Sequence, residues 1–443
     1  MKLYLTLACF LVLQVSIAQE VPLSAQSKTW TLQECIDYAL ENNITIKSAT
    51  LDKSTAEITY DQSKSERLPN LFGSASQNFS NGNSIDPITS NYVTDQIHST
   101  NVGINSSMTL FQGNQLNIKI KQNKLLLEQS IFQEEVEQNN ITLNILENYL
   151  RALYSKESIV IAENNWSASE KEVLRAKSRF DAGSIALSDY TEAQSQAATN
   201  KYNVIAAKND YQQLLLVLKQ LLELTPLDDF ALAELPDNSA ILSIPIDKTA
   251  LYQNAFGFLP EMKVSEMNLS VSEKALDIAK GAYLPTLSLN GSVGSGYTSV
   301  NDAAFSDQFN VNFNQRVGLS LSIPIFNRNQ TKAAVQKATI TIEKANIQKQ
   351  TTEKEVYKKV ETAYQNALAA QEQVAASQAS KVAAEQTYQL AQKKYELGGL
   401  STTDLVLSQN TYTNAQQNYL QAKYLNILYQ QLLQFYQGNE IKL

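Results

Sequence analysis

Few residues of this chain could do chemistry, and two aspartates stand out because they recur in matching surroundings. The sequence holds a single histidine, His98, which argues against a Ser-His-Asp triad and against a metal site built from histidines. The stretches "RFDAGSIALSDY" and "KYELGGLSTTDL" each place a glycine three residues and an aspartate nine residues after an aromatic residue. These aspartates, Asp189 and Asp404, can attract cations or cap the helices that begin beside them. We therefore predict no enzyme, no cofactor and no metal site, and both roles of the aspartates stay open.

The N-terminal residues 1–18 are typical of a secretory signal peptide. One lysine precedes an apolar run at 3–15 and a small-residue cleavage site, and this run is shorter than the ~20 residues that a membrane helix needs. Cys9 lies within the apolar run, which argues against a lipid anchor. Removal of the signal peptide leaves Cys35 as the only cysteine, so we expect no intramolecular disulfide.

The charge and the apolar runs of the mature chain limit its partners. The formal net charge is −8, which disfavours nucleic acid and anionic lipid. After the signal peptide no apolar stretch approaches the ~18 residues of a membrane helix, and the strongest is at 214–218. If the protein enters a membrane, it does so as a β-barrel, the other structure that satisfies all backbone groups in lipid.

The chain repeats one pattern at an interval of 215 or 216 residues. Three separated pairs of positions keep this interval, which favours a tandem duplication over chance. They are Leu68-Pro69 and Leu284-Pro285, Leu110-Phe111 and Ile325-Phe326, and Gly183 with Asp189 and Gly398 with Asp404.

Each repeat has the same order of expected elements: a helix, two strands, a long helix and a return helix. Proline and glycine mark the boundaries between them. The first repeat spans 19–225, with a helix at about 32–65, strands at 69–80 and 100–111, a long helix at 113–182 and a return helix at 187–224. A proline-rich linker follows at 226–247. The second repeat spans 248–443, with a helix at about 248–281, strands at 285–297 and 315–326, a long helix at 327–397 and a return helix at 402–437.

The expected strands alternate apolar residues with small or polar ones. In the last strand, Val317, Leu319 and Leu321 interleave with Gly318 and Ser320. Runs of about 10–13 residues suit tilted transmembrane strands, whereas soluble strands are usually about half as long. The segments between paired strands are rich in Asn, Asp, Ser and Thr, which predicts loops that face water.

The expected long helices contain no proline and no interior glycine. About 70 residues at 1.5 Å each would reach roughly 105 Å. Their small and apolar residues step in heptads, as in Val356, Val360, Ala363, Ala367 and Ala370, and the alanines let neighbouring helices approach closely. The first helix and the return helix of a repeat together match one long helix in length. We therefore expect the two shorter helices to stack end to end beside it.

The strands also predict assembly. Four strands are too few to close a membrane barrel, since known barrels start at about eight. Open sheet edges are not tolerated in lipid, so the chain must associate with copies of itself. Two copies would supply about eight strands and three about twelve. A barrel that continues into helices about 100 Å long is typical of a conduit across the outer membrane and the periplasm.

This plan resembles the TolC-like outer membrane efflux proteins over essentially the whole mature chain. The likeness lies in the duplicated order of Leu-Pro pair, two strands and long helix, and in the stretch "KYELGGLSTTDLVLSQNTYTNAQQNYLQAKYLNIL". It implies a mainly α fold with membrane β, in which a trimer completes a 12-stranded outer-membrane barrel continued by a long antiparallel coiled-coil α-barrel in the periplasm. It also implies contact with outer-membrane lipid in a Gram-negative bacterium.

The function implied by the resemblance is that of an outer-membrane exit duct in a tripartite efflux or type I secretion system. The implied partners are two further copies in a homotrimer, a periplasmic adaptor protein and an inner-membrane pump. The alternative is a secreted or periplasmic coiled-coil structural protein without channel activity, which explains the heptads but not the alternating strands. A small porin is a third option, and the helical bulk of the chain argues against it.

The resemblance also implies roles for residues of the two turns. The periplasmic gate would comprise Asp404, Tyr395, Asp189 and Ser188, and the hairpin tips that contact the adaptor would comprise Gly183, Gly398, Gly399 and Leu400. Two positions depart from the family's pattern, because Leu407 replaces a second aspartate and Leu400 replaces an arginine. We therefore expect a single acidic ring, and the salt bridge that locks the family's entrance lacks its arginine.

Overall fold

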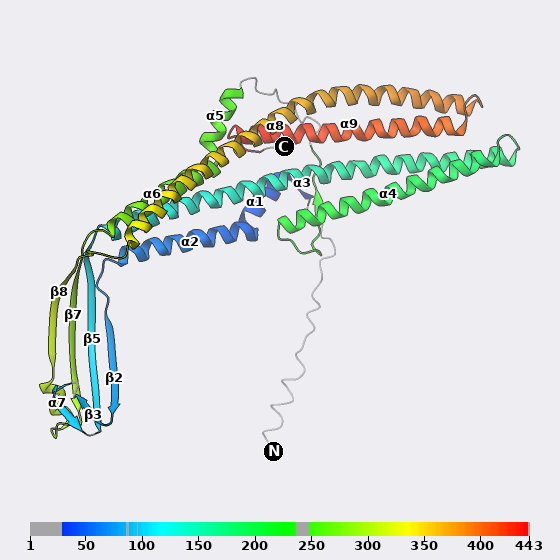
Figure 1. The fold of residues 1–443 in the computed structure, drawn as a ribbon. Helices are drawn as coiled ribbons and strands as arrows, with labels where there is room; N and C mark the ends of the chain where they lie inside the picture. The colour runs from blue at the N-terminus through cyan, green and yellow to red at the C-terminus, as the bar shows by residue number, and fades with distance from the viewer. Residues whose placement is uncertain (1–28, 86–87, 95, 236–247, 442–443) are drawn as a thin grey trace, which may run out of the picture.

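The computed structural model describes residues 29–85, 88–94, 96–235 and 248–441. The predicted signal peptide at 1–18 and much of the predicted linker lie outside these residues. A sheet of four long strands stands at one end of the molecule, and helices extend from it to two hairpin turns at the other end (Figure 1). The fold is therefore mainly helical, with the sheet and the turns at opposite ends.

Two pairs of helices of matched length preserve the sequence repeat. The long helices are α3 (Gln115–Asp181) and α8 (Gln330–Glu396), each of 67 residues. The return helices are α4 (Leu187–Leu221) and α9 (Thr402–Tyr436), each of 35 residues. α3 with α4 and α8 with α9 form two antiparallel hairpins that lie side by side (Figure 1). Among the described residues, no helix combines the length and the apolar character needed to cross a membrane.

The helices before the two Leu-Pro pairs are each divided in two, although the sequence predicts one helix at about 32–65 and one at about 248–281. The four helices are α1 (Leu32–Asn42), α2 (Ile44–Ser65), α5 (Lys248–Phe258) and α6 (Pro260–Gly281). Asn43 is extended (φ −61°, ψ 131°), and its side-chain oxygen accepts from the Thr45 N–H, so it ends one helix and caps the next. Pro260 starts α6 because proline suits the first turn of a helix and disfavours helix before it.

The shorter helices stack end to end along the long ones, as their lengths predict. α2 and α4 both pack against α3, and α6 and α9 both pack against α8 (Figure 1). At the first joint the Asn43 side-chain amide donates to the carbonyl of Leu221, the last residue of α4, at 2.9 Å. At the second joint the ring of Phe258 at the end of α5 meets the ring of Phe435 in α9, with centroids 6.1 Å apart. The breaks in the shorter helices therefore lie where these joints form.

Four antiparallel strands form the sheet in the order β2-β5-β7-β8. They are β2 (Phe72–Ser80), β5 (Ile97–Gln112), β7 (Thr286–Thr298) and β8 (Asn314–Ser322). The strand predicted at 315–326 ends at Ser322, since Pro324 cannot donate to a neighbouring strand. The repeats meet at the pairing of β5 with β7, where Asn105 lies opposite Ser292. Both repeats therefore share one sheet, with β2 and β8 at its edges.

The two faces of the sheet differ in character. One face carries apolar side chains, among them Ile104 and Leu319, and the other carries small and polar residues, among them Asn105 and Ser292. The apolar side chains are largely exposed in the single chain, with Val317 at 84%. One face of the sheet therefore suits lipid and the other suits water.

Short elements form where the sequence predicts loops between the paired strands. They are α7 (Phe305–Val311) and the paired strands β3 (Asn83–Ile85) and β4 (Tyr92–Thr94). In α7 the buried side-chain amide of Gln308 bonds to the backbone of Thr298, Asn301 and Ala303. A further unpredicted pair, β1 (Thr29–Trp30) and β6 (Ala231–Leu232), joins the start of the described chain to the region between the repeats.

The main apolar core lies about midway along the long helices. It gathers residues of both repeats around Tyr149 of α3, which is 2% exposed. The Tyr149 hydroxyl bonds to the carbonyls of Trp30 at 3.1 Å and of Ala233 at 3.0 Å, and so holds β1 and β6 against α3. The predicted heptad positions Val356 and Val360 of α8 are buried in the same core, which confirms this part of the seam.

Two glycines make a close approach where the strands turn into the helices. Gly113, just after β5, has a φ of +54°, and Gly281 ends α6. A Cβ on Gly113 would lie 2.0 Å from the carbonyl oxygen of Gly281, far inside van der Waals contact. In the second repeat Arg328 and Asn329, which match Gly113 and Asn114, also have positive φ. The turn into the long helix therefore uses a left-handed backbone in both repeats, and in the first it also needs the space that glycine leaves.

We predict that Gly113→Ala lowers the free energy of unfolding by about 2–4 kcal/mol, because the new methyl group meets both a positive φ and the Gly281 carbonyl. Gly257→Ala is the matched control, since Gly257 lies in α5 with nothing within 4 Å of a Cβ. We expect this control to be neutral or stabilising by up to about 1 kcal/mol. Thermal unfolding of the detergent-solubilised protein, followed by circular dichroism, measures both; equal effects would contradict the prediction.

Candidate functional site

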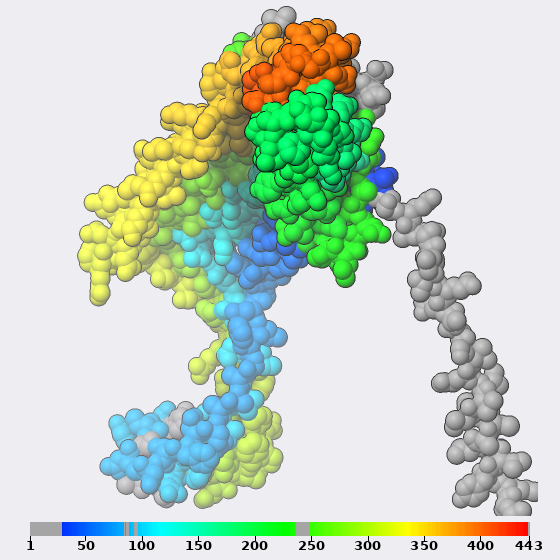
Figure 2. Space-filling view, turned by 90° about the vertical axis from the view of Figure 1, so that its right-hand side faces the viewer, coloured from blue at the N-terminus to red at the C-terminus, as the bar shows by residue number. Residues whose placement is uncertain are grey.

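The predicted turn glycines lie at the two hairpin tips. Gly183 and Gly398 have φ values of +69° and +76°, and a Cβ on either would meet nothing within 4 Å. The residue after each glycine returns a backbone bond to the last turn of the long helix, at 2.8 and 2.9 Å. This closure requires a left-handed residue, which is why glycine stands there. Figure 2 views the tips end-on, with the α8–α9 hairpin in orange beside the α3–α4 hairpin in green.

Asp189 and Asp404 occupy the third position of the helices that follow the turns. The N-caps are Ala186 and Ser401, both extended with a φ of −75°. At the second tip the Asp404 N–H donates to the Ser401 Oγ at 3.1 Å, and the Ser401 hydroxyl donates to the Asp404 carboxylate at 2.7 Å. At the first tip the Asp189 carboxylate accepts from the Ala186 N–H at 3.3 Å, but alanine offers no side-chain acceptor in return. Both aspartates therefore support helix starts, and Asp404 does so while exposed.

Tyr395 lies inside the second hairpin. It is 2% exposed and packs with Ala391 and Leu405, while Leu400 lies partly buried against the same cluster. Its phenol is 3.4 Å from the Thr402 hydroxyl. Burial raises the pKa of the Tyr395 phenol above its usual value, so the group stays neutral at physiological pH. Within one chain Tyr395 and Leu400 thus support the tip from inside.

The remaining predicted tip residues are at the surface. Gly183, Gly398 and Gly399 are exposed at the ends of the hairpins, and Ser188 is exposed beside Asp189. None of the hydrogen bonds among the described residues joins one aspartate of the pair to the other. The fold therefore brings the predicted residues to one end of the molecule, but it does not join them in one cluster within a single chain.

Arg179 joins the two hairpins and was not among the predicted residues. Its Nη2 donates to the carbonyls of Tyr395 and Glu396 at 3.0 Å each, and its guanidinium lies 4.7 Å from the centroid of the Tyr395 ring. These carbonyls belong to the last turn of α8, where a cation is favoured by the helix dipole. Arg175, one turn earlier on α3, adds an ion pair with Glu396 at 3.5 Å. The sequence does place an arginine in the last turn of α3. It does not show that the partners of this arginine lie on the other hairpin.

A second set of polar contacts links the return helices. The Thr403 hydroxyl of α9 donates to the Glu192 carboxylate of α4 at 2.9 Å. Farther from the tip, the Gln196 amide donates to the Asn410 side chain at 3.3 Å. The hairpins are therefore tied near their tips by hydrogen bonds on both sides. Such bonds exchange readily with water and contribute about 1 kcal/mol each.

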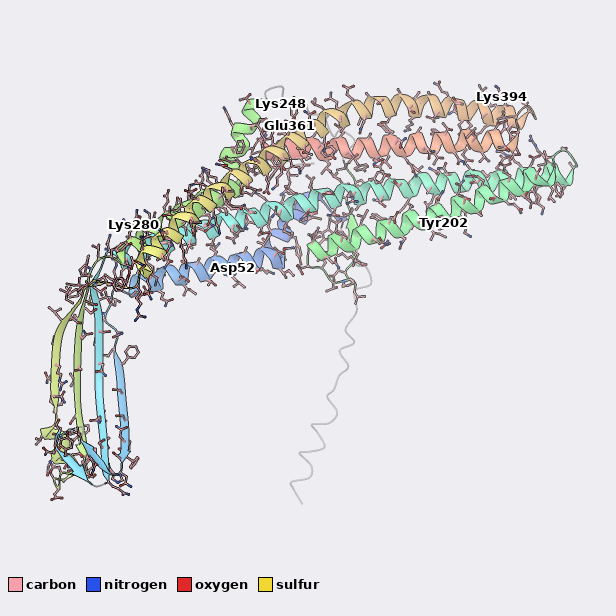
Figure 3. The ribbon with its side chains drawn as sticks, in the orientation of Figure 1. Asp52, Tyr202, Lys248, Lys280, Glu361 and Lys394 are labelled. Atoms are coloured by element: carbon pink, nitrogen blue, oxygen red, sulfur yellow. The ribbon has the colours of Figure 1, made fainter. Side chains whose placement is uncertain are left out.

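A polar cluster at the start of α5 holds this helix on α8, well away from the tips. Lys248 Nζ lies 3.1 Å from the Glu361 carboxylate, to which the Tyr252 hydroxyl also donates (Figure 3). The Tyr252 hydroxyl and the other donors around this carboxylate lower the pKa of Glu361 to about 2. Lys394, by contrast, lies near the tip of the second hairpin (Figure 3). The cluster thus has a structural role at mid-height.

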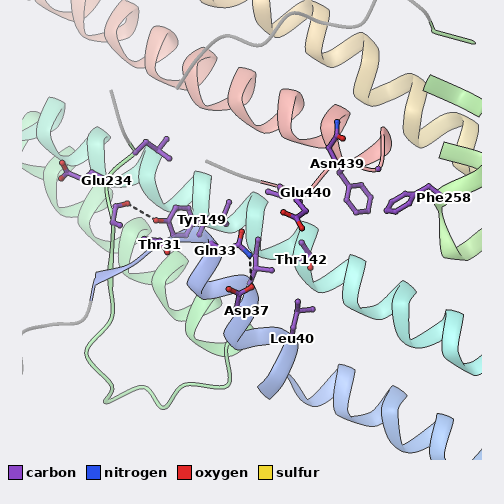
Figure 4. Close-up of a pocket in the computed structure, with 17 residues that line it drawn as sticks. Thr31, Gln33, Asp37, Leu40, Thr142, Tyr149, Glu234, Phe258, Asn439 and Glu440 are labelled. Carbon is purple, nitrogen blue, oxygen red and sulfur yellow. Dashed lines mark hydrogen bonds between the residues drawn. The ribbon is translucent and has the colours of Figure 1, made fainter. Parts of the chain in front are cut away.

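One larger hollow lies where α1 approaches the end of α9 (Figure 4). Its volume is about 920 Å³, and apolar side chains such as Leu40 and Phe258 line much of it. Asp37 at this hollow accepts from the Gln33 amide at 2.9 Å, and Glu234 pairs with a lysine at 3.1 Å. In the part of the chain that the structure describes, no group of three or more His, Cys, Asp or Glu side chains could hold a metal ion.

Comparison with known proteins gives a match over both repeats. A family model described as outer membrane efflux protein matches residues 35–223 and 251–438. Outer membrane protein TolC of Escherichia coli (strain K12) is 23% identical over 423 residues, which cover 92% of this chain and 82% of TolC. The match therefore extends over nearly all of the chain and most of that relative.

Solved structures of similar fold agree with this match. The Campylobacter jejuni CmeC outer membrane channel has a TM-score of 0.81 at 20% identity, over 92% of this chain and 85% of CmeC. CusC has a TM-score of 0.80 at 18% identity, over 92% of both chains. At these identities the likeness concerns the fold, including its internal duplication.

The unequal caps of the two return helices lead to a prediction. We expect Ala186→Ser to slow amide hydrogen exchange in the first turn of α4 by about fivefold, because a serine there could accept from the Asp189 N–H as Ser401 does from Asp404. The converse change, Ser401→Ala, is expected to speed exchange in the first turn of α9 by a similar factor. Hydrogen–deuterium exchange with mass spectrometry measures both. Unchanged exchange at both tips would show that these caps do not limit local opening.

Proposed function

Because the chain belongs to the outer membrane efflux protein family, we propose that it is the outer-membrane exit duct of a tripartite efflux or type I secretion system. It conducts substrates passively from a periplasmic adaptor and an inner-membrane pump to the exterior. The observation that carries the proposal is a two-faced sheet at one end of the molecule and paired hairpin tips at the other, joined by helices about 100 Å long. The sheet lies in the outer membrane of a Gram-negative bacterium and the helices in the periplasm.

The other candidate function fits fewer of the observations. A secreted or periplasmic coiled-coil structural protein would account for the long helices. It would not account for a four-stranded sheet whose apolar face is exposed in the single chain. The family match over both repeats also favours the duct.

The edges of the sheet supply the reason for assembly. β2 and β8 are the edge strands, and open edges are not tolerated in lipid. Three chains joined β8 to β2 would form one closed sheet of about twelve strands, with the apolar face toward lipid. The same threefold symmetry would gather six hairpins around one axis below the sheet. We therefore infer a homotrimer.

The hairpin tips would form the periplasmic entrance of this trimer. We assign the ring of negative charge to Asp404, with Asp189 and Ser188 on the neighbouring hairpin and Tyr395 behind it as support. Three carboxylates around a narrow axis favour cations and bind polyvalent ones. The support for this assignment is the exposure of Asp404 at the tip and the recurrence of its surroundings in both repeats.

The tips would also be the place where the adaptor docks. Gly183, Gly398 and Gly399 are exposed there, and Leu400 is partly exposed. The Arg179 bonds and the contacts between α4 and α9 are few and polar, so the hairpins can part at a cost of a few hydrogen bonds. Adaptor contact at the tips could therefore open the entrance without unfolding the apolar core at mid-height.

We predict that the protein is recovered from outer-membrane fractions as a heat-modifiable trimer. An unheated sample should run on denaturing gels at about three times the mass of the boiled chain, because a closed sheet resists detergent until it is heated. Recovery as a monomer from the soluble periplasmic fraction would reject the duct and favour the structural protein.

A pair of variants separates the gate from the helix cap. Asp404→Asn removes the charge but keeps an oxygen that can accept from the Ser401 hydroxyl, whereas Ser401→Ala removes the cap and keeps the charge. In planar bilayers we expect Asp404→Asn to weaken block by divalent cations by roughly tenfold or to raise single-channel conductance. We expect Ser401→Ala to leave both close to wild type. Equal effects of the two variants, or none from Asp404→Asn, would assign Asp404 to capping alone.

A further inference from the structure

We propose that Arg316 makes the strand section of the channel selective for anions, a proposal that rests on the proposed function. Arg316 is the third residue of β8, a strand that follows α7 and runs from the far end of the sheet toward the helices (Figure 1). The solutes it favours are small inorganic anions and anionic organic molecules in transit. Rings of arginine or lysine are a general means by which pores prefer anions.

Strand pairing puts Arg316 on the polar face of the sheet. Residues directly opposite each other in an antiparallel pair project to the same side. Arg316 lies opposite Ser292, Ser292 lies opposite Asn105, and Asn105 lies opposite Phe72, so this row crosses all four strands. The positions two residues away along the same face are Asn, Ser and Gly. Arg316 therefore belongs to the face that would meet water in the channel.

The charge of Arg316 has no counterpart on the sheet. Among the residues of β2, β5, β7 and β8 it is the only Lys, Arg, Asp or Glu. None of the ion pairs formed by the described residues includes it. His98, the histidine of these strands, lies on the opposite face, edge-on to Phe79 with ring centroids 4.8 Å apart. The polar face thus carries one positive charge per chain in a protein whose net charge is −8.

The arginine is also accessible to solutes. It borders a hollow of about 570 Å³ on the sheet, together with Asn105, Asn290 and Ser292. Gly318, two residues along the same face, has no side chain that could cover the guanidinium, and Arg316 is exposed in the single chain. A long cationic side chain on an uncovered, water-facing surface keeps its charge available.

Assembly would multiply this charge. β8 is an edge strand, so in the proposed trimer Arg316 stands beside strand β2 of the neighbouring copy. The sequence of that strand, "FGSASQNFS", contains no charged residue, so the neighbour would not neutralise the arginine. Threefold symmetry then gives one ring of positive charge within the strand section.

The test is the reversal potential of the purified protein in planar bilayers under a KCl gradient, which gives the ratio of chloride to potassium permeability. Arg316→Gln is expected to lower this ratio by about threefold or more, since it removes every positive charge of the ring. Arg316→Lys keeps the charge and should keep the wild-type ratio. Arg151→Gln is the matched control, because it removes the same charge from an exposed position of α3, where Arg151 pairs with Glu147 at 3.5 Å. We expect this control to leave the ratio unchanged.

Salt supplies a second measurement on the same two proteins. Raising KCl from about 0.1 M to about 1 M shortens the Debye length from about 10 Å to about 3 Å, so the difference in permeability ratio between wild type and Arg316→Gln should shrink. An unchanged ratio in conducting Arg316→Gln channels, a fall in Arg316→Lys as large as in Arg316→Gln, or a difference that salt does not reduce would overturn the proposal. Failure of the proposed function would look different, since wild-type protein would then carry no current at all.

Discussion

A helix of 67 residues is too long to be covered by one shorter neighbour, and much of the architecture follows from this constraint. Each long helix carries a seam of small and apolar residues that must be shielded along its length. Two shorter helices supply the cover from opposite ends, so they have to meet at mid-height. Asn43 makes the meeting possible because it caps α2 and also bonds to the end of α4 at Leu221. The main apolar core, around Tyr149, forms at the same height.

The helices bury fewer apolar side chains against one another at the tips than at this core. At the second tip the buried apolar cluster comprises only Ala391, Tyr395 and Leu405. The contacts between the hairpins there include hydrogen bonds and an ion pair, which water can replace, and the approach of the Arg179 guanidinium to the Tyr395 ring. Segments with few buried apolar contacts open locally at lower free energy than the core. The proposed entrance at this end is therefore compatible with a well-packed joint at mid-height.

Sequence patterns predicted the parts of the molecule that repeat, and missed those that depend on single polar side chains. Heptad steps, strand alternation and the glycines at Gly183 and Gly398 were sufficient because each expresses a local backbone preference. For the candidate site, recurrence identified Asp404, but its bond to the serine cap depends on the geometry of the turn. Arg179 was missed because its partner, the Tyr395 carbonyl, is 216 residues away along the chain. A single long-range hydrogen bond has no periodicity, so only the folded chain shows it.

The part of α3 beyond the core acts as a lever arm. Asp181 follows Tyr149 by 32 residues, which corresponds to about 48 Å of helix. A tilt of about 10° at the core would therefore displace the tip sideways by about 8 Å. The Arg179 bonds to the other hairpin are 3.0 Å long and could not survive such a displacement. A small rotation at mid-height thus moves the tip far enough to make or break the contacts between the hairpins. The displacement per degree of tilt grows with the number of helical residues between the core and the tip.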